Sequence, residues 1–160
     1  MRLMRKTSLA LSIIVLVAFH SHAAEPEVLV TKDMARNAIT VFRQDTLSPR
    51  GRAAGEVVRR FAEKDDSVII QITPKVIPFI NDLKVMQEDR TLLLDAFVVG
   101  NVDAQFLRNE KKDDPYSGVT EMIEVYKQMK KRNPAVNIPD VEKFVEMEKH
   151  GELKKYLATP

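Results

Sequence analysis

The pattern of apolar positions predicts a helix over residues 91–108 that is buried on almost every side. At about 100° per residue its apolar side chains fall on nearly every side of the helix. A helix that is apolar all round lies in a protein core or in a membrane. Polar residues interrupt this one before it reaches the roughly 18 apolar residues that a membrane span needs. We therefore expect the central helix of a soluble domain.

The other expected helices are amphipathic, and several begin where a capping side chain precedes a proline, an arrangement favoured in a first helical turn. An outer helix over 115–132 should lie on the central one, with its apolar residues on one arc. Three further helices should run from Pro49 to the charged residues 63–66, from Pro74 to about Met86, and from Pro139 to Gly151. A final turn or two should follow Gly151, since glycine suits the left-handed position after a helix.

Two stretches have mixed signals. Residues 33–42 fit a short helix, which we expect, although AITVF within them also has strand propensity. Residues 68–72, VIIQI, have the composition of a strand but no evident pairing partner, so an extended connector and an early helical turn remain alternatives.

A faint repeat links two of the prolines. Pro74 and Pro139 are each followed by apolar residues at offsets +2, +5 and +6. The repeat suggests two helix pairs flanking the central helix, a solenoid-like layout. Alternatively, any amphipathic helix that starts at proline needs this spacing. Either way, the prediction is an all-α, single compact domain of five or six helices.

The N-terminus has the form of a secretory signal peptide. A basic segment, residues 1–6, precedes an apolar run over 9–19, and Ser21-His22-Ala23 supplies small residues at a cleavage site. We expect cleavage after Ala23, or after Ala24, and a periplasmic or secreted mature protein; an uncleaved anchor is the alternative. The expected organisation is a signal peptide over 1–23, an arm with a short helix over 24–47, and a helical domain over 48–160.

Loss of the signal changes the charge balance. The chain has 25 basic and 23 acidic residues, and three of the basic ones lie in the signal, so the mature chain has a net charge near −1. This balance gives no electrostatic case for nucleic-acid binding. We expect no stable membrane insertion after cleavage either. With no Cys in an exported chain, stability must come from packing alone.

Few groups for catalysis or metal binding remain. His150 is the one histidine beyond the signal, and its place at a helix end is explained by the helix dipole. One His and no Cys argue against ordinary zinc, copper, haem and iron–sulfur sites. The phosphate-binding glycine loops and serine-nucleophile motifs are also absent. We predict no catalytic residue, metal or cofactor.

Carboxylates on the central helix are the exception. Asp95 and Asp103 are the candidates for a carboxylate-dependent hydrolase, although some 12 Å of helix axis separates residues eight positions apart. Asp95 lies within LLLDAFVV, where an unpaired carboxylate would be costly. We expect it to form a structural salt bridge.

The candidate binding surface is a polar stripe of Asn101, Gln105 and Arg108 on the central helix. Gly100 beside it would allow close approach of a backbone or ligand. The competing interpretation is that the stripe faces water or caps a neighbouring helix. The leading functional hypothesis is a non-enzymatic module that binds an envelope protein or peptide, since helix pairs often build concave binding faces. A hydrolase acting on cell-wall glycan is the alternative, and a small-ligand carrier a third hypothesis.

Overall fold

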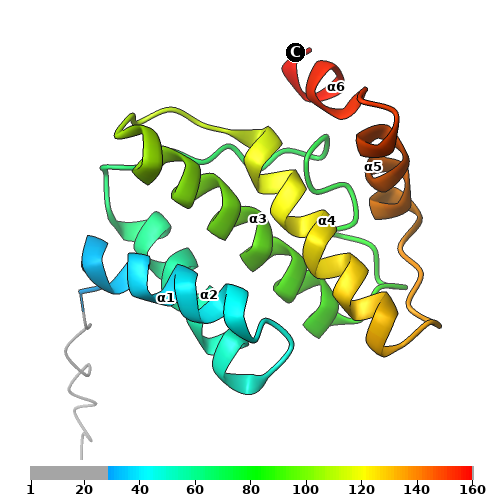
Figure 1. The fold of residues 1–160 in the computed structure, drawn as a ribbon, viewed down its shortest axis with the longest axis horizontal. Coiled ribbons are helices and arrows are strands. Elements are labelled where there is room, and N and C mark those ends of the chain that lie inside the picture. The colour runs from blue at the N-terminus through cyan, green and yellow to red at the C-terminus, as the bar shows by residue number, and fades with distance from the viewer. Residues whose placement is uncertain (1–28, 160) are drawn as a thin grey trace, which may run out of the picture.

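The structure, a computed structural model, describes residues 29–159 as six helices packed into one body (Figure 1). Their bounds are α1 (Lys32–Gln44), α2 (Pro49–Lys64), α3 (Gln87–Arg108), α4 (Pro115–Arg132), α5 (Pro139–Lys149) and α6 (Leu153–Ala158). The described residues contain no strand. The predicted all-α single domain of five or six helices is confirmed.

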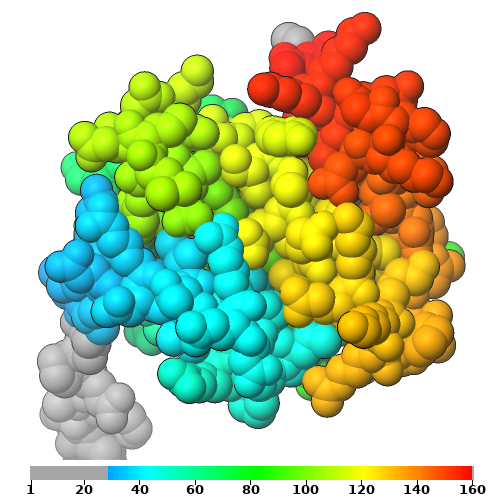
Figure 2. All heavy atoms as spheres, viewed as in Figure 1, coloured from blue at the N-terminus to red at the C-terminus, as the bar shows by residue number. Residues whose placement is uncertain are grey.

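The most buried helix is α3, which runs through the middle of the body and packs against α4, α2 and α1 (Figure 1). It begins four residues before the predicted start and ends where expected, at Arg108. In Figure 2 the side chains of α1 and α4 adjoin over it, so that mainly the end of α3 and the residues after it reach this face. The central position predicted for α3 is confirmed.

Two glycines allow α3 and α4 to approach closely. A Cβ on Gly100 would lie 2.4 Å from Ser117 O, and one on Gly118 would lie 2.6 Å from the Phe97 ring. Any side chain at either position would push the helices apart. The sequence-based expectation that Gly100 permits close approach of another backbone is therefore confirmed, and that backbone belongs to α4.

The first helix pair, α1 and α2, packs along one side of α3 (Figure 1). The short helix expected over 33–42 is present and slightly longer, with Thr31 Oγ1 capping it by accepting from Met34 N. Ser48 caps α2 in the same way, with Pro49 in the first turn as predicted. The contact between the two helices is tight, because a Cβ on Gly55 would lie 2.9 Å from the Phe42 ring.

The helix expected from Pro74 to Met86 is wrong: residues 65–86 form a connection of turns and extended chain. Pro78 explains the difference. It cannot donate a helical hydrogen bond, its ring clashes with the preceding turn, and it disfavours helical geometry at Ile77. The chain instead makes separate turns, such as the one closed by the bond from Ile80 N to Ile77 O at 3.3 Å.

Loss of this helix also removes the proposed repeat, because Pro74 and Pro139 start different structures. The apolar residues after Pro74 are nevertheless in the core, where Val76, Ile77 and Phe79 are buried. The apolar spacing thus predicted which residues face inward but not the backbone that carries them. Residues 68–72 are extended, one of the alternatives left open.

The C-terminal helices α5 and α6 pack on α4. Buried Tyr126 of α4 holds the start of α5, since its hydroxyl donates to Glu142 Oε1 at 2.7 Å and accepts from Ile138 N at 3.1 Å. As expected, α5 ends just before Gly151, which has a φ of 73°.

The predicted signal peptide lies outside the described residues. Among residues 29–159, no helix is long and apolar enough to cross a membrane.

Candidate functional site

Asn101 and Gln105, two of the three residues predicted to bind a partner, are buried and hydrogen-bonded to the chain itself. Gln105 Nε2 donates to Ile69 O and to Asn101 Oδ1, both at 2.8 Å, and Gln105 Oε1 accepts from Ile69 N at 3.1 Å. Asn101 Nδ2 donates to Asp113 Oδ1 at 2.8 Å, and Asn101 Oδ1 accepts from Asp114 N at 3.1 Å. The two amides hold the connections before and after α3 against the helix.

Arg108, the third predicted residue, is partly exposed and pairs with Asp114 Oδ2 at 2.8 Å. It therefore braces the same connection, residues 109–114, that Asn101 holds. Of the three residues, only Arg108 offers a partner an accessible side chain. Its role in binding remains a prediction.

A large hollow lies elsewhere among the described residues. A groove of about 1470 Å³ opens between the α1–α2 loop, α2, the first turns of α3, and the end of α4 with the residues that follow it. In Figure 1 these elements meet below the centre, where the α1–α2 loop faces the end of α4. Arg132 of α4 spans one end by donating to Leu47 O at 3.3 Å. We call this hollow the main groove.

The main groove has apolar patches along its floor and rim. Leu92 and Met129 are core residues that reach its floor, whereas Met86 on the rim is 66% exposed. The remaining apolar lining comes from Leu47, Pro49, Ala53 and Val136. A partner can therefore bury apolar surface here without any change in the core.

Asp95 lies in the wall of the main groove and forms the expected salt bridge. Arg59 Nε of α2 donates to Asp95 Oδ1 at 2.8 Å, and Arg59 Nη1 donates to Glu63 Oε1 at 3.1 Å. The expectation of a structural ion pair is confirmed. The carboxylate is nonetheless also part of a cleft, since Asp95 and Arg59 both line the groove.

The environment of Asp95 disfavours its charge. Burial raises the pKa of Asp95 to about 6, although the hydrogen bond and the charge of Arg59 lower it, and nearby Glu56 and Glu63 raise it. The pKa of Arg59 is raised by its two carboxylate partners in spite of partial burial. Perturbed carboxyl groups in a cleft are candidates for function.

One oxygen of Asp95 is unoccupied. Within residues 29–159 the only donor to this side chain is Arg59, which binds Oδ1. Thr120 Oγ1 is the one fully buried side-chain oxygen or nitrogen without a partner in that range, so Asp95 Oδ2 keeps contact with the groove. The residue as a whole is only 3% exposed. A donor entering the groove would find a nearly desolvated acceptor.

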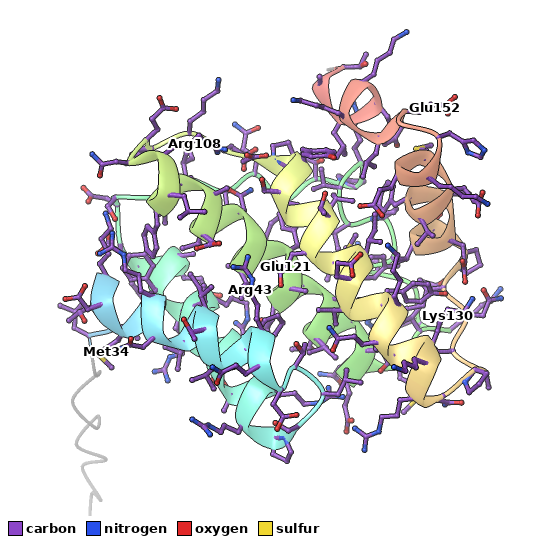
Figure 3. The ribbon with its side chains drawn as sticks, in the orientation of Figure 1. Met34, Arg43, Arg108, Glu121, Lys130 and Glu152 are labelled. Atoms are coloured by element: carbon purple, nitrogen blue, oxygen red, sulfur yellow. The ribbon has the colours of Figure 1, made fainter. Side chains whose placement is uncertain are left out.

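Asp103, the second candidate carboxylate, lies at another site. Arg43 of α1 binds Asp103 Oδ2 and Glu121 Oε2 of α4, both at 2.7 Å, and these partners raise the pKa of Arg43. Figure 3 shows Arg43 and Glu121 pointing toward one another between α1 and α4. Two smaller hollows flank this pair, with volumes of about 500 Å³ and 250 Å³. The structure thus does not bring Asp95 and Asp103 together.

Metal ligation finds no support in the described chain: residues 29–159 contain no group of three or more His, Cys, Asp or Glu side chains that could hold an ion. His150, at the end of α5, lies with Nδ1 2.9 Å from Glu146 O. This contact agrees with the structural role expected for it.

The sequence analysis missed the groove residues contributed by α2. In the sequence, Arg52, Glu56 and Arg59 have the pattern of the polar face of an amphipathic helix, and nothing in that pattern distinguishes a groove wall from a face in contact with water. The spacing of Arg59 and Glu63, four residues apart, was the local signal for an ion pair on this face. It could not reveal that Asp95, 36 residues further along, completes the network.

Comparison with known proteins adds no assignment: no protein-family model matches the chain, and no curated protein or solved structure is significantly similar to it.

Proposed function

We propose that this protein is a non-enzymatic module that binds a segment of a protein or peptide in the bacterial cell envelope, and that the segment lies in the main groove. The observation that carries the proposal is the groove itself, about 1470 Å³ in volume. Most single sites for small ligands measure roughly 300–1,000 Å³ and enclose most of the ligand. A larger hollow that is open to solvent suits a stretch of polypeptide better than it suits the third candidate, a small-ligand carrier.

The lining of the groove supports this choice. Exposed Met86 and Ala53 offer apolar contact, and methionine adapts its shape to different partners. Charged side chains surround these residues, as in protein interfaces that combine an apolar centre with a polar rim. The cell-envelope location rests on the predicted signal peptide.

A blocking substitution tests the proposal. Ala53 is exposed on α2 in the groove wall, so Ala53→Trp should fill the groove without disturbing the core. Ala158→Trp is the matched control, because Ala158 is an exposed alanine at the end of α6 and is not part of the groove lining. Peptides selected from a random library against the mature protein should bind the wild type and the control equally. They should bind Ala53→Trp at least about tenfold more weakly.

Selection of no peptide at all, or peptides indifferent to Ala53→Trp, would refute binding in the main groove. Circular dichroism melting of all three proteins must show equal stability for the comparison to count. Mass spectrometry of the exported protein checks the location, with an N-terminus expected at Ala24 or Glu25. An intact Met1 on soluble cytoplasmic protein would contradict export.

A second candidate, hydrolysis of cell-wall glycan, is favoured by one observation. The pKa of Asp95, in the wall of the main groove, is raised to about 6 by burial. A carboxyl group whose pKa is raised toward neutral pH can serve as a general acid. If this candidate is right, purified cell-wall glycan is cleaved by the wild type and Asp95→Asn abolishes turnover. Under the binding proposal, no cleavage is expected from either protein.

A further inference from the structure

The side chains that line the main groove include more carboxylates than arginines. Its lining contains the four carboxylates Glu56, Glu88, Asp89 and Asp95 and the three arginines Arg52, Arg59 and Arg132. Only Asp95 among these carboxylates forms an ion pair within residues 29–159. The groove therefore has acidic groups in excess of the cations that balance them.

Each arginine of the lining also binds another group of the chain. Arg59 binds Asp95 and Glu63. Arg132 donates to Leu47 O at 3.3 Å, and Arg52 reaches Glu88 O at 3.4 Å. Arg52 and Arg132 each use one donor on a backbone carbonyl and keep their charge. The carboxylates of the lining that form no ion pair within residues 29–159 are Glu56, Glu88 and Asp89, and the second oxygen of Asp95 is also open to a partner.

The carboxylates also destabilise one another. Burial has the largest effect and raises the pKa of Asp95 and of Asp89; Arg59 and Arg52, respectively, lower these pKa values, and Glu56 and Glu88 raise them by a smaller amount. Like charges held close together in a partly desolvated site favour binding of a cation, which relieves their repulsion. Asp95 Oδ2, buried with its residue yet free of hydrogen bonds from the described chain, is the strongest of these acceptors.

We propose that the main groove recognises a basic side chain, Lys or Arg, of the bound segment, and that Asp95 Oδ2 accepts a hydrogen bond from its cationic head. Glu56 flanks the head, and the aliphatic stem lies along the apolar lining near Met86 and Ala53. Lysine and arginine combine both parts, an apolar stem and a charged end. This inference rests on the proposed function and names the chemistry of its partner.

The test uses the peptides selected from the random library on the mature protein. Each strong binder should contain a Lys or Arg whose replacement by norleucine, which keeps the stem and removes the charge, weakens binding about tenfold or more. Asp95→Asn and Glu56→Gln should each lower affinity for the basic peptide and leave the norleucine peptide unaffected. Glu110→Gln is the matched control, an exposed carboxylate outside the groove lining.

The two proposals fail in different ways. Peptides that lose affinity for Ala53→Trp but contain no essential basic residue would overturn the inference and leave the proposed function standing. Unchanged affinity of the basic peptide for both Asp95→Asn and Glu56→Gln would also overturn it. If no peptide is selected, both proposals fall. Glu56 is exposed, so Glu56→Gln keeps the test valid even if Asp95→Asn folds poorly.

Discussion

Two buried polar clusters lie on the same helix, α3, and differ in one respect. Around Asn101 and Gln105, the side-chain amides are matched by groups of the chain on the connections that flank α3. Around Asp95, Arg59 occupies one carboxylate oxygen and the other faces the main groove. Saturated networks fix structure, whereas an acceptor left open at the edge of a groove is available to a ligand.

The largest effect on stability should come from a charge added to the hydrogen-bonded cluster of Asn101 and Gln105. Asn101→Asp removes the donor to Asp113 Oδ1 and sets two carboxylates against each other where Asn101 is fully buried. We expect a loss of about 3–5 kcal/mol in the free energy of unfolding at neutral pH. Urea denaturation measures it. Partial recovery near pH 4 should accompany it, because the new carboxyl group would then be protonated. A loss below about 1 kcal/mol would show that the cluster tolerates charge and is not saturated.

A smaller effect on stability, which depends on pH, is expected from Asp95→Asn. Its pKa in the folded protein, about 6, lies above the usual value of about 3.9 in unfolded chains. Between pH 4 and pH 6 the folded state therefore binds more protons, so this group adds stability below about pH 4 that is lost as the pH rises through 6. Relative to Asp95→Asn, the wild type should gain at most about 3 kcal/mol on going from pH 7 to pH 4.

Denaturation of both proteins across this range measures the difference. The two proteins differ only at position 95, so the difference between their stabilities isolates the contribution of the Asp95 carboxyl group. A difference that is independent of pH would mean that Arg59 holds the folded pKa of Asp95 at its ordinary value. A wild type that loses stability relative to the variant on acidification would mean that the pKa is lowered.

The comparison also shows what one sequence could and could not predict. The positions of α3 and α4 followed from apolar periodicity and from Asp114-Pro115, which are local signals. The segment after Pro74 carried the same start signal, but Pro78 prevented the helix. A proline at a helix start and one in a helix interior obey opposite rules, and here both apply within five residues.

The site was harder to predict than the fold. The polarity of Asn101 is the same whether it faces water or a connection of the chain, so the sequence suggested an accessible stripe. The main groove is built from three segments far apart in sequence, near residues 47–59, 86–95 and 129–136. No pattern within one segment shows that the three segments lie side by side in the fold. Asp95 was recognisable because a carboxylate in an apolar run must find a partner, but its open oxygen depends on the geometry of α2.

The smallest effect on stability is expected at Arg108, the one residue of the predicted stripe with an accessible side chain. Its ion pair with Asp114 is partly exposed, and such pairs contribute about 0–1 kcal/mol. Arg108→Ala should therefore lower the free energy of unfolding by less than about 1 kcal/mol, because Asn101 still holds the same connection through Asp114 N. If partners bind in the main groove, affinity for the selected peptides should also stay unchanged. An Arg108→Ala protein that melts like the wild type but loses its peptides would place the binding site at Arg108, outside the main groove. The unused oxygen of Asp95 would then have no part in binding.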